Sequence, residues 1–290
     1  MTKGYLVSEF GGPEVMVWDT LNLGALAADA VRVRVGASGI NFAETRMRAG
    51  DYSGQELPFV MGMEVAGTIE EVGEAVTGLS RGDREWGRAR GAHAEGVGRD
   101  PDHLMLLPDN LSFVQGAAIP VGWLTAWHAL YTVGGMKAGD RILVEAVGGS
   151  VGSAALALAK QAGCWVLGTA SRDEKLAQAA SLGCDAVVNY TRESVSEQVA
   201  RLTEGQGMDI GLMTIGDATA DDLIDSMGMD GRVVMFGSTG GREITFNLRI
   251  GILNIQLLSM SISTSPAFMT QTMSDFRTRA LPLFASGELE

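Results

Sequence analysis

The chain has 290 residues, of which 46% are hydrophobic and 20% charged, a composition typical of a globular protein with one large or two moderate domains. Its 22 basic and 35 acidic residues give a formal net charge of −13, which repels phosphate backbones and anionic lipid and argues against nucleic-acid and membrane-surface partners. No apolar run reaches the roughly 18 residues that a membrane span needs, and the N-terminus lacks an apolar signal core, so we expect a cytoplasmic protein.

The first part of the chain, to about residue 118, shows short alternating strands interrupted by glycine. Examples are residues 31–35 (VRVRV) and residues 65–72 around Gly67. Helical periodicity is scarce in this part, and the pattern predicts a mostly β, barrel-like domain. Residues 115–131 are helix-rich and lead into the second part.

From about Ala138, apolar strands alternate with helices. This alternation predicts a parallel sheet with right-handed crossovers, buried on both faces. The expected strands are 141–146, 164–169, 186–190, 210–215 and 232–236, and the expected helices are 151–162, 174–182, 194–202 and 220–227.

A glycine-rich turn, Ala146-Val-Gly-Gly149-Ser150-Val151-Gly152, follows the first of these strands and opens a helix. In this context Gly149 lets the backbone approach a pyrophosphate, Gly152 lets the helix pack against the strand, and the free N–H groups of the first helical turn face the phosphates. The alternative is a strand–helix turn that binds nothing. Because further strand–helix units follow, we interpret the turn as a dinucleotide site.

The residues after the second strand indicate which dinucleotide binds. Sites for NAD usually carry Asp or Glu about twenty residues beyond the turn, at the end of that strand, where this chain has Ser171 and Arg172. Asp173 follows in what we expect to be the first turn of a helix, where acids are favoured in any case. Ser171, Arg172 and Lys175 can donate to a 2′-phosphate, so we predict NADPH, although Arg172 and Lys175 would also suit a solvated helix.

Several further stretches resemble the medium-chain dehydrogenase/reductase superfamily, and within it the zinc-free quinone oxidoreductase branch that includes zeta-crystallin. The matching stretches cover nearly the whole chain in the expected order. They are Gly39–Glu44 (GINFAE), Arg48–Tyr52 (RAGDY), Pro58–Gly67 (PFVMGMEVAG), Leu124–Leu130 (LTAWHAL), the nucleotide turn and Ser171–Lys175.

The resemblance implies an α/β protein with a Rossmann-type doubly wound parallel sheet and a GroES-like, mostly β barrel domain. We therefore expect a GroES-like catalytic domain at residues 1–118, completed by about 255–290 and truncated at the C-terminus relative to the family. We expect a Rossmann-type NADPH-binding domain at 119–254 that pairs with a second copy to form a homodimer.

The resemblance also implies roles for individual residues. Lys175 and Tyr190 are expected to flank the 2′-phosphate. The nicotinamide side is expected to contact Asn41, Tyr52 and Thr125, and the middle of the cofactor Phe236, Gly237 and Ser238.

Asn41 and Tyr52 are the candidates for the catalytic side of the site. The amide of Asn41 could donate to a carbonyl or hold the nicotinamide, or Asn41 could simply form a turn. The hydroxyl of Tyr52 could donate to the acceptor, or its ring could pack against the cofactor or a loop. Glu44 and Arg48, spaced i, i+4, are interpreted as an ion pair on a helix.

We expect no metal. Zinc-dependent relatives have a cysteine at the position of Asn41 and a His-Glu pair at Met63-Glu64, and the cysteine-rich structural zinc loop is missing here. Both replacements remove a ligand type that zinc prefers. The charged segment at 85–97 also departs from the family, and we interpret it as a rearranged loop beside the cleft.

These observations predict an NADPH-dependent, zinc-independent reductase that transfers hydride to a quinone or an α,β-unsaturated carbonyl, a small-molecule substrate. The alternatives are an enoyl-thioester reductase of fatty-acid or polyketide type, and a non-catalytic, crystallin-like protein that binds NADPH.

Overall fold

The computed structural model describes residues 2–52, 54–237, 239–241, 243–265 and 267–289. The chain divides into two compact units. The first contains Met1–Val121 together with Arg277–Glu290, and the second contains Gly122–Phe276. The domain boundaries expected at 118/119 and 254/255 stay predictions. No helix in the described residues is both long and apolar enough to cross a bilayer.

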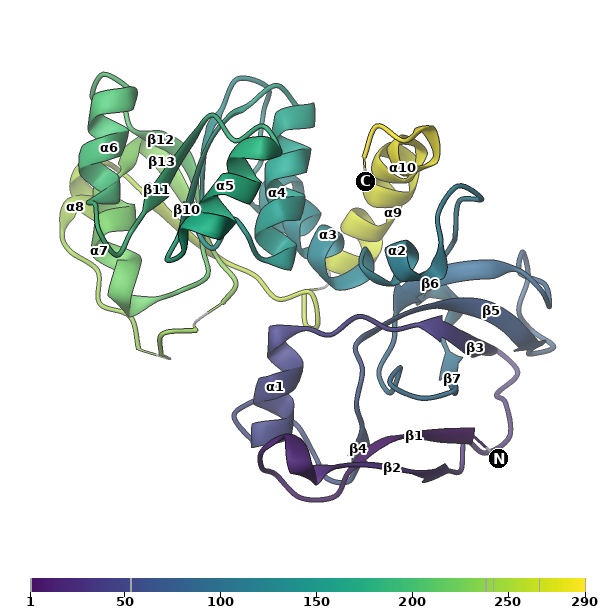
Figure 1. Ribbon diagram of the computed structural model, residues 1–290. Helices are drawn as coiled ribbons and strands as arrows, with labels where there is room; N and C mark the ends of the chain where they lie inside the picture. The colour runs from purple at the N-terminus through teal and green to yellow at the C-terminus, as the bar shows by residue number, and fades with distance from the viewer. Residues whose placement is uncertain (1, 53, 238, 242, 266, 290) are drawn as a thin grey trace. The chain divides into compact units, whose positions relative to one another are not determined.

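The first unit is mostly β, as the alternating pattern predicts (Figure 1). A five-stranded antiparallel sheet has the order β7-β3-β5-β6-β8, and a three-stranded sheet has the order β2-β1-β4. The strands are β1 (Thr2–Val7), β2 (Met16–Leu21), β3 (Val31–Ala37), β4 (Phe59–Val60), β5 (Glu64–Val72), β6 (Arg84–Arg88), β7 (Gly96–Arg99) and β8 (Leu104–Leu106). The helices are α1 (Phe42–Ala49), α2 (Phe113–Ala117), the start of α3 (Pro120–Trp127) and α10 (Leu281–Ser286).

The barrel core forms where the inward positions of alternating strands meet. Val31, Val33, Val65 and Ile69 are fully buried in it, because successive side chains of a strand point to opposite faces. The C-terminal segment packs onto this unit, where the amide of Asn110 donates to the carbonyl of Phe284 at 2.9 Å.

The segment expected to be a rearranged loop is partly a regular strand. Residues 85–88 lie in β6, which pairs with β5 and β8, and residues 96 and 97 begin β7, which pairs with β3, so the loop interpretation is wrong for these residues. Glu85 points into the interior and is fully buried. A charged residue in an otherwise buried strand obscured the strand pattern in the sequence.

The second unit is the expected Rossmann-type fold, a six-stranded parallel sheet flanked by helices (Figure 1). The strand order is β11-β10-β9-β12-β13-β14. The strands are β9 (Arg141–Val144), β10 (Trp165–Ala170), β11 (Ala186–Asn189), β12 (Met208–Met213), β13 (Met227–Met235) and β14 (Gln256–Ser259). The helices are α4 (Ser150–Gln161), α5 (Asp173–Ser181), α6 (Val195–Leu202), α7 (Asp217–Asp225), α8 (Arg249–Ile252) and α9 (Met273–Asp275).

The order reverses at β9, because β10 lies on one side of it and β12 on the other. In open parallel sheets such a switch point, at the carboxyl ends of the strands, is where ligands bind. The nucleotide turn, residues 146–152, follows β9 directly, and the other candidate cofactor residues of this unit include those just after the ends of β10, β11 and β13.

Candidate functional site

The turn between β9 and α4 has the backbone geometry of a close strand–helix junction. Ala146 has a positive φ of 50°, and its carbonyl accepts the N–H of Gly149 at 2.8 Å. A Cβ at Gly152 would lie 2.4 Å from that same carbonyl oxygen and 2.7 Å from the Cα of Val147. Position 152 therefore requires glycine if the helix is to begin this close to the strand.

The start of α4 is open on its outer side. Gly149 is the N-cap residue, and both it and Ser150 are exposed. A Cβ at Gly149 would have only the Ala146 carbonyl, at 3.2 Å, within 4 Å. The twelve-residue helix therefore begins at exposed residues, and the free N–H groups and dipole of such a helix start suit a pyrophosphate. Val151 lies in the same first turn.

Strand β10, the second strand of the parallel sheet in chain order, ends beside this turn. Ser171 and Arg172 are exposed, and Lys175 is half-buried. The stem of Lys175 packs on the turn, since a Cβ at Gly148 would lie 2.6 Å from its Cδ. Its ammonium group is therefore anchored next to the glycine turn by the packing of its aliphatic stem.

Asp173, the first carboxylate after β10, already has partners. It accepts hydrogen bonds from the Asn189 amide at 2.7 Å and the Arg192 guanidinium at 2.8 Å. These hydrogen bonds lower the pKa of Asp173. The Asp173 carboxylate is therefore held by β11 and the residues after it, and the two exposed side chains that precede it, Ser171 and Arg172, can donate hydrogen bonds. Tyr190, next to Asn189, packs half-buried against the core.

A residue that sequence reasoning missed, Glu145, lies between β9 and the turn and is only 3% exposed. Its carboxylate accepts the N–H groups of Thr214 at 2.7 Å and Ile215 at 2.9 Å, and the hydroxyl of Thr219 at 2.5 Å. Burial raises the pKa of Glu145, and these hydrogen bonds oppose the rise. The only available signal was a charged residue at the end of an apolar strand.

The loop after β13 lies against the loop that Glu145 holds. The N–H of Phe236 donates to the Met213 carbonyl at 3.3 Å. A Cβ at Gly237 would lie 2.9 Å from the carbonyl oxygen of Thr214. Ser238 lies outside the described residues. Thr125, on α3, is 7% exposed and belongs to the same unit.

Asn41 and Tyr52 belong to the first unit. Tyr52 is half-buried in the segment after α1. Asn41 is the N-cap residue of α1 and is 9% exposed. Its side-chain amide donates to Glu64 at 2.6 Å, and its backbone N–H donates to Glu44 at 2.6 Å.

The Glu64 carboxylate links two segments of the first unit by hydrogen bonds. Besides the amide of Asn41, it accepts the backbone N–H of Val121 at 2.8 Å. A Cβ at Gly39 would lie 2.1 Å from a Glu64 oxygen, so this glycine makes room for the carboxylate. Burial raises the pKa of Glu64, while the bonds from Val121 and Asn41 oppose the rise.

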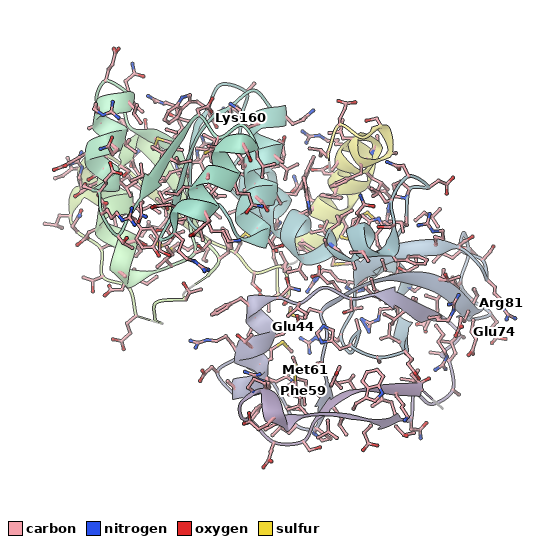
Figure 2. The ribbon with its side chains drawn as sticks, viewed as in Figure 1. Glu44, Phe59, Met61, Glu74, Arg81 and Lys160 are labelled. Carbon is pink, nitrogen blue, oxygen red and sulfur yellow. The ribbon has the colours of Figure 1, made fainter. Side chains whose placement is uncertain are left out.

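Glu44, labelled on α1 in Figure 2, points inward. It lies 3.5 Å from the Nε2 of His93, which also contacts the Gly39 carbonyl at 3.0 Å. The expected ion pair with Arg48 was therefore wrong, because the α1 N-terminus directs Glu44 into the unit to bond to Asn41. Burial is the main cause that raises the pKa of Glu44. His93 was not among the residues that the sequence marked as candidates.

Two positions at which zinc-dependent relatives carry ligands hold Asn41 and Met63 in this chain. Asn41 offers an amide whose nitrogen is already bonded to Glu64, and Met63 precedes Glu64. Zinc is bound in proteins by thiolate, imidazole and carboxylate groups, and amides and thioethers are not among these ligands. Among the residues that the structure describes, no group of three or more His, Cys, Asp or Glu is arranged to hold a metal ion.

Comparisons with known proteins agree with the two units. The model of the alcohol dehydrogenase GroES-like domain matches residues 27–117, and the model named zinc-binding dehydrogenase matches residues 150–286. A quinone oxidoreductase-like protein 2 homolog from Nematostella vectensis is 31% identical over 99% of this chain and 80% of its own length. The chain belongs to the quinone oxidoreductase branch of the medium-chain dehydrogenase/reductase superfamily.

Solved structures of this branch superpose closely. A quinone oxidoreductase of Pseudomonas syringae has a TM-score of 0.91 and 32% identity, covering 100% of this chain and 90% of its own. The Escherichia coli quinone oxidoreductase complexed with NADPH has a TM-score of 0.87 and 28% identity, covering 99% and 90%. The expected superfamily, branch and fold are therefore confirmed, and the chain is an oxidoreductase.

Proposed function

We propose that this protein is an NADPH-dependent, zinc-independent reductase whose acceptor is a quinone or an α,β-unsaturated carbonyl. The observation that carries the proposal is the turn at Ala146–Gly152. It leaves the α4 N-terminus open beside a strand end that presents Ser171, Arg172 and Lys175, while Asp173 is held by Asn189 and Arg192.

The cofactor choice follows from charge at that strand end. A 2′-phosphate needs donors, and guanidinium and ammonium groups bind it through charge-assisted hydrogen bonds. The hydroxyls of an unphosphorylated ribose are usually held by a free carboxylate. The nearest carboxylate, Asp173, already accepts two hydrogen bonds. The relative from Escherichia coli was solved with NADPH, which supports the same choice.

The residues of this chain would bind and orient the reactants. The N–H groups at the start of α4 would hold the pyrophosphate, and Lys175 and Arg172 the 2′-phosphate. Bound NADPH supplies the hydride. In the first unit, Glu64 holds the amide of Asn41 in place, and this side chain would be the polar anchor for the nicotinamide or the acceptor. Tyr52 would offer a hydroxyl to the charge that develops on the acceptor oxygen.

Zinc independence is part of the proposal. An acceptor that takes hydride without a Lewis acid fits a site whose metal-ligand positions are filled by an amide and a thioether. Homodimer formation through the Rossmann-type sheet and location in the cytoplasm stay predictions.

The test is a substrate scan with purified protein. NADPH oxidation is followed by absorbance with quinones, enones and crotonyl thioesters, and metal content is measured in the same sample. We expect turnover with quinones or enones and less than stoichiometric zinc. Turnover of crotonyl thioesters alone would favour the enoyl-thioester reductase, NADPH binding without turnover would favour the crystallin-like alternative, and stoichiometric zinc with activity lost on chelation would contradict zinc independence.

A further inference from the structure

Glu145 connects three segments at the carboxyl edge of the parallel sheet. It directly precedes Ala146, the first residue of the nucleotide turn. Its carboxylate accepts the N–H groups of Thr214 and Ile215, the first two residues after β12. The carbonyls of those two residues in turn accept the N–H groups of Thr239 at 3.2 Å and Gly240 at 2.7 Å, in the loop after β13.

Resting on the proposed function, we infer that Glu145 is a positioning residue for the cofactor site. It holds the loops after β12 and β13 in register with the nucleotide turn, and so sets how tightly the protein binds NADPH. No contact between Glu145 and the cofactor is required, because its effect passes through backbone groups.

The energetics favour this role over simple packing. A carboxylate that is 3% exposed loses most of its hydration, and this loss is tolerated when donors replace the water. Here two backbone N–H groups and the Thr219 hydroxyl converge on it. Thr214 and Ile215 lie just beyond the end of β12, where the ladder to β9 stops after Leu212. Without Glu145 their N–H groups would lose this acceptor, and the loop would lose its link to the turn.

Asp222 provides a matched control in the same unit. Its carboxylate also accepts two backbone N–H groups, from Val195 at 2.7 Å and Ser196 at 2.9 Å, and the hydroxyl of Ser194 at 3.1 Å. These donors belong to the start of α6 rather than to the loops after β12 and β13. Replacing Asp222 therefore removes the same kind of interaction without touching the turn.

The experiment compares Glu145→Ala with Asp222→Ala in the full chain, because alanine removes the acceptor oxygens at both positions, whereas an amide would keep one of them. We expect Glu145→Ala to weaken NADPH binding, measured by fluorescence titration, by about tenfold or more. Without cofactor, hydrogen exchange in peptides covering 212–219 and 233–241 is expected to accelerate in Glu145→Ala only. Asp222→Ala is expected to lower the melting temperature and to accelerate exchange at the start of α6, with NADPH affinity unchanged.

A milder variant covers the case in which Glu145→Ala does not fold. Thr219→Val removes one donor and leaves the carboxylate, and it is expected to change affinity and exchange in the same direction by a smaller factor. The inference is overturned if wild type binds NADPH and Glu145→Ala binds it within about twofold as tightly. It is also overturned if Asp222→Ala weakens binding as much. If wild type itself does not bind NADPH, the proposed function fails instead, and exchange in the two loops still decides whether Glu145 holds them.

Discussion

The side-chain amide of Asn41 donates a hydrogen bond of 2.6 Å to the carboxylate of Glu64, and both residues are buried. A zinc-dependent relative would use the first of these positions for a cysteine ligand. Here the pair is an amide and a carboxylate that satisfy each other, which ties the proposed anchor of the site to the interior of the first unit.

This pairing makes a pH-dependent prediction for Asn41→Asp. The variant places a second carboxyl beside Glu64, so one of the two must hold a proton in the folded state and its pKa rises. A raised folded-state pKa means that stability falls as pH increases. We expect a loss of unfolding free energy on the order of 2 kcal/mol at pH 8 and a smaller loss at pH 5.5, measured by urea unfolding.

Asn22→Asp is the control for that experiment. Asn22 is exposed, and its side-chain oxygen accepts the N–H of Gly24 at 3.0 Å, a role that a carboxylate also fills. Its stability should change little at either pH. A loss of the same size at both pH values in Asn41→Asp would contradict the proposed clash of carboxyls.

Glu85 predicts a second pH effect. It is fully buried in β6, neither of its oxygens has a hydrogen-bond partner among the described residues, and burial raises its pKa to about 8 despite the charge of Arg99. The unfolded chain releases this proton at much lower pH, so wild-type stability falls between the two pKa values as pH rises. Glu85→Gln mimics the protonated form. The difference in unfolding free energy between this variant and wild type should therefore shift in favour of the variant by on the order of 3 kcal/mol from pH 5 to pH 8.

Urea unfolding of both proteins at several pH values checks this prediction. Glu74→Gln is the control, because Glu74 is exposed (labelled in Figure 2). The difference in unfolding free energy between this variant and wild type should not change with pH. A flat difference for Glu85→Gln as well would show that the buried carboxyl does not change its protonation on folding.

The nucleotide turn predicts a strong effect of Gly152→Ala. The added Cβ would lie 2.4 Å from the Ala146 carbonyl oxygen, so the helix must move away from the strand. We expect NADPH affinity to fall by more than about tenfold, with a lower melting temperature. Gly251→Ala, in a helix of the same unit with no atom within 4 Å of its added Cβ, should leave both unchanged. If Gly152→Ala bound NADPH as tightly as wild type does, the close approach of α4 to the Ala146 carbonyl would not be required for cofactor binding.

Lys175→Met tests the source of cofactor preference. The variant keeps the aliphatic stem that packs on Gly148 and removes the charge. We expect NADPH affinity to fall about tenfold and NADH affinity to stay constant. Lys160→Met is the control and makes the same change at the end of α4 (Figure 2), where the ammonium pairs with Asp185 at 2.7 Å. This variant should keep the wild-type preference for NADPH over NADH. Equal affinity of wild type for both cofactors would remove the role given to Lys175.

Much of the architecture follows from local pattern. The alternation of strands and helices after residue 138 predicts the parallel sheet, and the observed strands β9 to β13 overlap the expected ones. The turn at Ala146–Gly152 could be found because all of its parts lie within seven residues, and a strand–turn–helix junction imposes glycine wherever backbone approaches backbone. Family membership could be predicted for the same reason, since its motifs are short and contiguous.

The sequence by itself determined the fold class, the glycine turn and the donors at the end of β10. Only the tertiary structure brought Glu145 to Thr214, Asn41 to Glu64 and Glu44 to His93, and only it placed Glu85 in the core. Asn41 and Glu64 are 23 residues apart in the sequence, and Glu145 and Thr214 are 69 residues apart. No local sequence pattern encodes contacts over such separations. Their approach depends on strand order and register, which are set by the packing of the whole unit.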